Sequence, residues 1–210
     1  MLTFAKGGDP VKQDVSICSF IEEVVQFNLS GSNVKLIFEA APNLWKARVD
    51  KGQISQVFSN LAINANQVMP NGGCLYITIE NAPLRLGDIP SLEKGLYLNF
   101  TIRDECMGIK ESDLDKIFSP YFSTKKQGSG LGLATVYSII SKHGGHISVS
   151  SSKHQGTSFS IYLPASDTIT EATVSPLKEV LTVTQASSKI LIMDDEDMIC
   201  ELSSTYLASK

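Results

Sequence analysis

Apolar residues recur at helical spacing in three parts of the chain. Residues 51–69 show this most clearly, because seven apolar side chains share one helical face: Ile54, Val57, Phe58, Leu61, Ala62, Ala65 and Val68. Residues 15–29 and 131–143 have the same period, and residues 111–118 form a shorter run with an acidic first turn. The pattern therefore predicts three amphipathic helices and one short helix.

Alternating apolar and polar residues separate these helices. This alternation predicts strands over residues 74–82, 95–105, 146–152 and 157–164, with a shorter candidate at 35–41. The predicted helices and strands cover similar shares of the chain, and strands that follow one another can pair antiparallel. We therefore expect an α+β domain, built as a two-layer sandwich with helices on one face of a sheet.

Length and composition fit a folded protein with one complete domain and part of another. The chain has 210 residues, of which 42% are hydrophobic and 19% charged, whereas typical domains have roughly 100 to 150 residues. Its net charge of −4 provides no basic surface for a phosphate backbone, so we expect no nucleic-acid partner. No apolar run reaches the roughly 20 residues that cross a bilayer, and the four cysteines form no CxxC pair. We expect a cytoplasmic protein whose segment makes no membrane contact.

Composition also suggests the boundaries of the domain. Residues 1–14 contain Gly-Gly and Asp-Pro and are typical of an extended lead-in. Residues 165–188 are rich in Ser, Thr and Ala and predict a linker. Residues 189–210 then begin with a buried-type apolar strand that runs into acidic residues and a helix start. They predict an incomplete βα unit of a further domain.

A glycine-rich loop precedes the last predicted helix. Gly128, Gly130 and Gly132 occupy every second position, and Lys125 and Lys126 stand just upstream. Glycine permits close approach of the backbone to an anion, and a helix N-terminus favours negative charge. The loop could therefore cradle a phosphate, although a mobile surface linker would show the same spacing.

Three further sets of side chains could carry chemistry. Asn60 and Asn64 share one helical face and could offer amide oxygens to Mg²⁺, or could cap neighbouring backbone. Asp104 ends a predicted strand at a glycine-bearing turn, where it could accept a hydrogen bond from a nucleobase amine or be an ordinary turn residue. Phe118 and Phe122 could close over a planar ligand or belong to the core.

The order of these motifs resembles one family. NLAINA, DECMG, FSPYF, GSGLGL and GTSFSIYLP follow one another along the chain. They resemble the N, first glycine, F, second glycine and Gly-Thr boxes of the ATP-binding domain of histidine protein kinases, in the superfamily of the gyrase, Hsp90 and MutL ATPases. The resemblance covers residues 15–164 and implies a Bergerat-type fold, a mixed sheet covered by helices on one face.

The resemblance implies a role for each matching position. Asn64 is expected to bind the Mg²⁺ that accompanies ATP, with Asn60 supporting the same site, and Lys125 or Lys126 to lie over the phosphates. Asp104 is expected to bind the adenine amine. The other expected nucleotide contacts follow from the remaining boxes: Gly108, Phe118, Phe122, Gly128, Gly130, Leu131, Gly132 and Thr157.

The first glycine box departs from the pattern of the family. The usual motif is D-x-G-x-G, whereas this chain has DECMG, with Cys106 in place of the first glycine. A cysteine would cost of the order of 1 kcal/mol if the turn needs a positive φ at that position. ATP binding could then be weakened, so the sequence leaves open a nucleotide-binding or interaction module without transfer activity.

The neighbouring domains of such kinases are incomplete in this sequence. The family phosphorylates a histidine on a preceding helical dimerisation domain, and residues 1–14 resemble only the tail of that domain. KILIMDDED resembles the first strand of a response-regulator receiver domain, where Asp194 and Asp195 would bind Mg²⁺. The resemblance therefore implies an excerpt of a hybrid sensor histidine kinase. Its full-length form is expected to be a homodimer and could be anchored in a membrane by other regions.

The expected function follows from this resemblance. The domain would bind Mg·ATP and donate the γ-phosphoryl group to a histidine of the dimerisation domain, in a two-component phosphorelay that ends on a receiver domain or response regulator. An ATPase of the gyrase or Hsp90 type fits less well, because the long transducer regions of those enzymes have no counterpart here.

Overall fold

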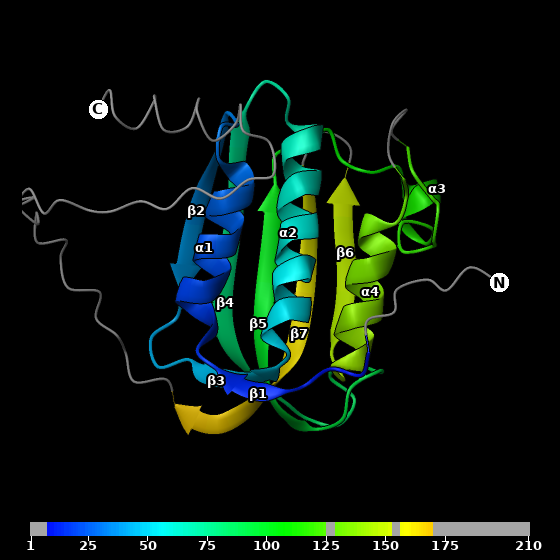
Figure 1. Cartoon of the computed structure of the whole chain (residues 1–210). Coiled ribbons are helices and arrows are strands. Elements are labelled where there is room, and N and C mark those ends of the chain that lie inside the picture. Colours follow the sequence, from blue (N-terminus) through cyan, green and yellow to red (C-terminus); the bar gives the residue numbers. More distant parts are fainter. Residues whose placement is uncertain (1–7, 125–128, 153–155, 170–210) are drawn as a thin grey trace, which may run out of the picture. The chain divides into compact units, whose positions relative to one another are not determined.

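The computed structural model describes residues 8–124, 129–152 and 156–169 (Figure 1). Four helices lie in these ranges: α1 (Ile17–Leu29), α2 (Lys51–Val68), α3 (Glu111–Leu114) and α4 (Gly132–Lys142). The strands there are β1 (Gln13–Val15), β2 (Val34–Ala40), β3 (Trp45–Val49), β4 (Gly73–Leu84), β5 (Gly95–Asp104), β6 (His146–Ser152) and β7 (Gly156–Ile169). The predicted βα unit at 189–210, with Asp194 and Asp195, lies outside the described residues.

The strands form one mixed sheet. Its order in the described chain is β1-β3-β7-β5-β4-β2, and β6 also pairs with β7. Only β2 and β4 pair in parallel, whereas the other neighbours are antiparallel. In the central antiparallel register, Asp104 at the end of β5 lies opposite Thr157 at the start of β7. The sheet thus joins two residues that are far apart in sequence.

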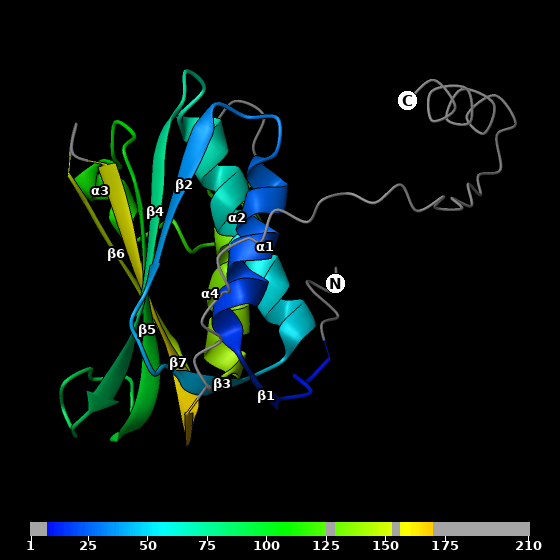
Figure 2. The same ribbon diagram turned by 90° about the vertical axis from the view of Figure 1, so that its left-hand side faces the viewer.

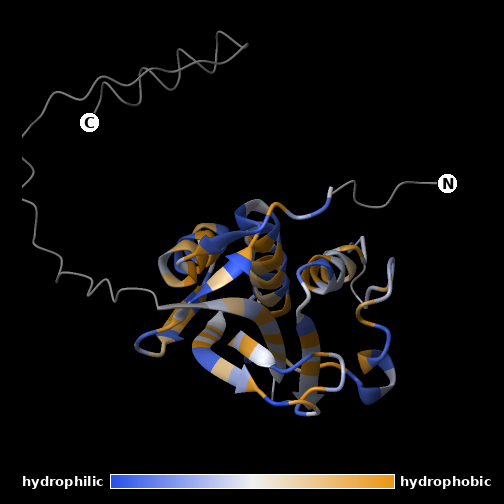
Figure 3. Cartoon of the chain, turned by 90° about the horizontal axis from the view of Figure 1, so that it is seen from below, coloured by the Kyte–Doolittle hydropathy of each residue, from blue (hydrophilic) through white to orange (hydrophobic). Residues whose placement is uncertain are grey.

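Helices cover one face of this sheet. Figure 2 shows α1, α2 and α4 on the same side, and α2 packs against both of the others. Hydrophobic positions recur along the helices and alternate with polar positions along the strands (Figure 3). Phe58 of α2 meets Phe100 of β5 edge-on, with ring centroids 5.5 Å apart, between the two layers. The two-layer α+β architecture predicted from the hydrophobic pattern is confirmed.

The predicted apolar face of the longest helix is almost entirely buried. Its buried members are Ile54, Val57, Phe58, Leu61, Ala62 and Ala65. Only Val68, at the end of the helix, is partly exposed. Asp50 begins the helix, because its side chain accepts a hydrogen bond from the backbone N–H of Gln53 at 3.0 Å. Periodicity therefore locates this helix from sequence, and the structure adds the cap at Asp50.

Several elements differ from the sequence prediction. β1 and β3 are not among the predicted strands, and β1 begins inside the predicted lead-in. Two element ends also move by four residues or more. The short helix stops at Leu114 rather than 118, and the buried Ile117 lies in the turn that follows. β7 continues to Ile169, five residues past the predicted end, and pairs there with β3 through Ala165 and Ser166. Polar, small residues hid this extension, because it is held by backbone pairing at the end of the sheet rather than by apolar alternation.

No helix in the described part of the chain combines the length and hydropathy that a membrane span requires.

Candidate functional site

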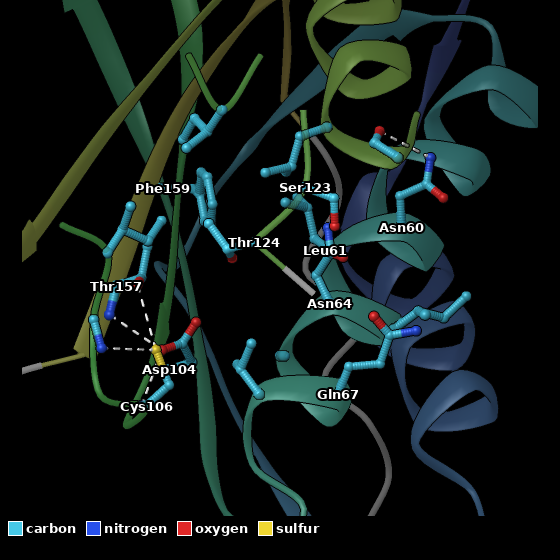
Figure 4. A pocket seen from close by; sticks show the side chains of 18 of the residues that line it. Asn60, Leu61, Asn64, Gln67, Asp104, Cys106, Ser123, Thr124, Thr157 and Phe159 are labelled. Atoms are coloured by element: carbon cyan, nitrogen blue, oxygen red, sulfur yellow. Dashed lines mark hydrogen bonds between the residues drawn. The ribbon is translucent and has the colours of Figure 1, made fainter. Parts of the chain in front are cut away.

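A cavity of about 810 Å³ lies between the helix layer and one end of the sheet. Its walls come from α2, the start of α4, the ends of β5 and β7, and the turn after β5. Figure 4 shows two polar ends in this cavity. One end holds Asp104 and Thr157, and the other holds Asn60 and Asn64 of α2. The cavity therefore brings together residues from all five of the sequence motifs.

Asp104 is held rigidly at the sheet end of the cavity. Its side chain is only 7% exposed. One carboxylate oxygen, Oδ1, accepts the backbone N–H groups of Cys106 and Thr157, each at 3.1 Å. Both bonds end on the same oxygen, so the other oxygen can accept a hydrogen bond from a donor in the cavity. The antiparallel register of β5 and β7 creates this arrangement.

The turn after Asp104 takes its positive φ at Gly108 and not at Cys106. Gly108 has a φ of 80°, and a Cβ there would collide with the carbonyl oxygen of Ser152. Cys106 is not among the described non-glycine residues with positive φ. The backbone strain considered for Cys106 is therefore absent, because the second glycine of the motif alone needs the left-handed conformation.

The Cys106 side chain points into the base of the cavity. Its Sγ accepts the backbone N–H of Gly108 at 3.3 Å and lies 3.4 Å from the Thr157 hydroxyl. Burial, followed by a hydrogen bond with Asp104, raises the pKa of this thiol, so it stays protonated near neutral pH. The cysteine therefore forms a compact, uncharged part of the wall.

The opposite end of the cavity lies where α2 meets the start of α4. The amide nitrogen of Asn60 donates to the carbonyl oxygen of Gly132 at 3.4 Å. A Cβ on Gly132 would lie 3.8 Å from the amide nitrogen of Asn64, which is an ordinary contact distance, so the start of α4 lies directly against this asparagine. Leu131 occupies the position before α4, and its side chain makes no capping hydrogen bond to the first turn. The first N–H groups of α4 can therefore bind an anion.

A backbone hydrogen bond closes the base of the loop before α4. The backbone N–H of Tyr121 donates to the carbonyl oxygen of Gly130 at 2.9 Å. Gly130 has a φ of 67°, and a Cβ there would collide with the backbone of Tyr121. Phe122 lines the cavity, whereas the ring of Phe118 packs against Tyr137 of α4 with centroids 5.6 Å apart.

Not every predicted site residue lines this cavity. Gly108, Gly130, Gly132 and Thr157 do, together with Asp104 and both asparagines. Leu131 and Phe118 are not among the lining residues, and Lys125, Lys126 and Gly128 lie outside the described residues. The chemical roles assigned to these positions stay predictions.

Comparison with known proteins identifies the domain. The sequence profile of the family described as "Histidine kinase-, DNA gyrase B-, and HSP90-like ATPase" matches residues 49–167. The chain belongs to this ATPase family. The matched range contains every cavity motif from the two asparagines to Thr157.

Several named relatives of this ATPase domain are sensor kinases. Sensor kinase CckA of Brucella abortus is 35% identical over 185 residues, which are 81% of this chain and 19% of that protein. Sensor histidine kinase ZraS of Escherichia coli K12 is 33% identical over 146 residues, or 70% of this chain and 29% of that protein. The chain therefore spans less than a third of the length of either relative.

A solved structure supports the same assignment. The catalytic domain of histidine kinase ThkA superposes with a TM-score of 0.59 at 28% identity, over 73% of this chain and 95% of that domain. The fold is thus the Bergerat-type α+β fold of histidine kinase catalytic domains.

The α2 end of the ATPase cavity, with Asn60 and Asn64, fits a hard cation that is shared with a phosphate ligand. Asn64 and Gln67, one turn apart on α2, both line it and carry amide oxygens of the kind that Mg²⁺ accepts. The described residues contain no group of three or more His, Cys, Asp and Glu side chains that could hold a metal by themselves. Such a site suits Mg²⁺, which keeps several waters and takes further ligands from phosphates.

Sequence reasoning missed several residues of the ATPase cavity. Gln67 follows Asn64 by three positions, so the helical period could have placed it on the same face. Leu133 and Phe159 also line the cavity, but as ordinary apolar members of a helix and a strand they carry no sequence signal. Ser123 and Thr124 line it as well, because the fold of their loop brings them to the cavity, and the sequence does not predict that fold.

Proposed function

We propose that this domain binds Mg·ATP and donates the γ-phosphoryl group to a histidine on a separate helical domain, in two-component phosphorelay signalling. The observation that carries the proposal is the cavity with two unlike polar ends. A fixed carboxylate, Asp104, lies at one end, and two amides beside an uncapped helix N-terminus lie at the other. This arrangement suits a ligand with an amine at one end and phosphates at the other.

The sheet end of the cavity would recognise the base. Asp104 would accept a hydrogen bond from the exocyclic amine of adenine through the carboxylate oxygen that the backbone bonds leave available. Guanine presents a carbonyl oxygen at that position, which a carboxylate would repel. Thr157 would lie beside the base, because its hydroxyl is 3.4 Å from Cys106 in the same wall. The domain is therefore expected to prefer ATP over GTP.

The helix end would hold the triphosphate. Asn64 would ligate Mg²⁺, and Asn60 would keep the start of α4 in place through its bond to Gly132. The first N–H groups of α4 would bind phosphate oxygens. Lys125 or Lys126 would lie over the phosphates once the loop closes. Bound Mg²⁺ would neutralise charge on the phosphates during transfer.

The phosphoryl acceptor would come from outside this segment. We infer that residues 1–14 continue from a dimerisation domain that carries the histidine and forms a homodimer, and that residues 189–210 begin a receiver domain with Asp194 and Asp195 as Mg²⁺ ligands. The similarity to sensor kinases that are several times longer supports such partners. This domain of the full protein would lie in the cytoplasm, where it would pass on the signal.

A nucleotide titration tests the binding half of the proposal. The chain would be titrated with a nonhydrolysable ATP analogue, with and without Mg²⁺, in parallel with Asn64→Ala. Asn66→Ala is the matched control, because Asn66 is on the same helix but does not line the cavity. We expect Mg²⁺-dependent binding that only Asn64→Ala weakens. Absence of binding by the parent chain and by both variants would refute the proposal.

A transfer assay separates the kinase from its main alternative, a nucleotide-binding or interaction module without transfer activity. A histidine-bearing helical domain of a related sensor kinase would be supplied with labelled ATP and this chain. Acid-labile, alkali-stable label on that domain is expected for the kinase. Tight ATP binding without any label on several such domains would favour the alternative.

A further inference from the structure

The sulfur atom of Cys106 occupies the wall beside the carboxylate of Asp104. Figure 4 shows both side chains meeting at the sheet end of the cavity, next to Thr157. The backbone N–H of Cys106 donates to Asp104 Oδ1 at 3.1 Å, so the two side chains leave the same turn. Both residues line the cavity. A ligand amine that reaches Asp104 must therefore pass close to this sulfur.

The position of the sulfur is fixed by its surroundings. Sγ accepts the N–H of Gly108 at 3.3 Å and lies 3.4 Å from the Thr157 hydroxyl. The Thr157 hydroxyl is held in turn, at 3.1 Å from the Ser151 hydroxyl. Rotating the thiol away would leave the Gly108 N–H without this partner. These contacts restrict the rotation of the Cys106 side chain, so the sulfur keeps its place in the wall.

We propose that Cys106 is a specificity-determining residue of the nucleotide site, which admits adenine nucleotides with an unsubstituted exocyclic amine and excludes those with an alkylated amine. The inference rests on the proposed function, because it concerns how the base is recognised. One N–H of a primary amine can donate a hydrogen bond to Asp104. The second N–H then faces the wall, where a hydrogen atom is small enough to fit. A methyl group in place of that second hydrogen would meet the sulfur.

The chemistry of the side chain explains why this exclusion is steric. The thiol is uncharged and a weak hydrogen-bond donor, so it contributes little polar attraction to a base. A glycine at position 106 would leave the volume of the sulfur and Cβ open. Since one misplaced methyl group in a packed pocket changes affinity by about tenfold or more, a side chain of this size suffices to discriminate.

A competition experiment with two nucleotides tests the proposal. ATP and N⁶-methyl-ATP would each displace a fluorescent ATP analogue from the parent chain, from Cys106→Ala and from Cys106→Gly. We expect the parent to prefer ATP by about tenfold or more, and the glycine variant by less than about threefold, with alanine between them. Cys106→Ala keeps the backbone restrained if the glycine variant folds poorly. Cys74→Ala is the control, because Cys74 is half-buried on β4 and does not line the cavity.

Thiol labelling provides a second measurement. Iodoacetamide would be added with and without ATP, and each cysteine-containing peptide quantified by mass spectrometry. Bound ATP is expected to slow alkylation of Cys106 and to leave Cys74 unchanged.

The outcomes separate the two proposals. A preference for ATP that is equal in all Cys106 variants, or equal alkylation of Cys106 with and without bound ATP, would overturn the role of Cys106 and leave the proposed function standing. Failure of every variant to bind ATP would overturn both.

Discussion

The imidazole of His143 accepts a hydrogen bond through Nε2 from the backbone N–H of Asp50 at 3.0 Å. This bond joins the end of α4 to the start of α2. These two helices form the end of the cavity that holds Asn60 and Asn64. Because Nε2 is an acceptor, the ring is neutral and Nδ1 carries the proton, which it donates to the carbonyl oxygen of Ile139 at 2.8 Å. The ring is fully buried, with 0% of its surface exposed.

Stability should therefore fall on mild acidification. Burial lowers the pKa of His143, and the hydrogen bond to the Ile139 carbonyl opposes it less strongly. The charges of Lys12 and Asp50 have still smaller effects, which lower and raise the pKa respectively. A lowered folded pKa means that the unfolded state binds more protons. The contribution of this group is complete above its unfolded pKa of about 6.5 and is lost as the pH falls from there toward the folded pKa.

Urea unfolding of the parent and of His143→Gln, at about pH 7.5 and about pH 5.5, measures this effect. The variant should be less stable at the higher pH by about 1–3 kcal/mol, because a buried partner is lost, but its stability should fall less between the two values. His146→Gln is the comparison, because burial also lowers the pKa of that histidine in a more exposed site. Equal pH dependence in the parent and His143→Gln would contradict the prediction.

Replacing Gly108 should cost more than replacing a glycine with the same φ in open space. Gly108→Ala adds a Cβ at a φ of 80° against the carbonyl oxygen of Ser152, whereas Gly31→Ala adds one at a φ of 75° with nothing within 4 Å. We expect a loss of about 1–2 kcal/mol for Gly31→Ala from the backbone conformation alone and about 2–5 kcal/mol for Gly108→Ala. Denaturant unfolding measures both, and equal losses would show that the turn can move away from β6.

The sequence predicts the helix layer well and the assembled site only in part. The apolar face of α2 is a local feature, so periodicity was sufficient to predict it. The cap at Asp50 is also local but was not predicted. The contact between Asp104 and Thr157 depends instead on the register of two strands that pair antiparallel. A linear pattern does not encode that register, and only the resemblance to a family brought both residues to one site.

The turn at Cys106 shows a different limit of sequence reasoning. The motif identified a missing glycine, but only the backbone could show which of its two glycine positions takes the positive φ. The extension of β7 past residue 164 was missed because Ala165 and Ser166 resemble a linker in composition while their backbone pairs with β3. In both cases the deciding interaction belongs to the main chain, which composition does not describe.

Ser151 should support nucleotide binding without touching the nucleotide. Its hydroxyl donates to the carbonyl oxygen of Gly156 at 2.9 Å and accepts the N–H of Ile109 at 2.8 Å, so it ties β6 to the turn after β5. Since its own proton is used, the Thr157 hydroxyl must be the donor in the 3.1 Å contact between the two side chains. This bond anchors the Thr157 hydroxyl in the wall of the cavity.

Ser151→Ala should therefore lower both the free energy of unfolding, by about 1–3 kcal/mol, and the affinity for ATP. The loss of affinity follows because the turn and the Thr157 hydroxyl both lose an anchor. Ser150→Ala, at the exposed neighbouring position of β6, should change stability by less than about 0.5 kcal/mol. Calorimetric titration with Mg·ATP measures the affinity. A Ser151→Ala protein that is less stable but binds ATP unchanged would reduce this serine to a structural role.

Truncation should separate the end of the folded domain from the segment beyond it. A chain that ends at residue 188 keeps all of β7, so deleting residues 189–210 should leave the unfolding temperature of the ATP-binding domain within a few degrees of the parent value. A chain that ends at residue 164 removes Ala165 and Ser166, which pair with Ala47 and Lys46 of β3. That edge of the sheet would then lose several backbone hydrogen bonds, each worth about 0.5–1.5 kcal/mol.

Thermal unfolding of the two truncated chains beside the parent tests this boundary, and ATP binding by the longer one shows that its site is intact. The chain ending at 164 should unfold at a clearly lower temperature, because β3 carries the buried Ala47 and Val49 of the core and connects β1 to the rest of the sheet. A large loss of stability on removing only residues 189–210 would mean that this segment helps to hold the domain together. Equal unfolding temperatures for the chains ending at 164 and 188 would mean that the β3–β7 pairing contributes no stability.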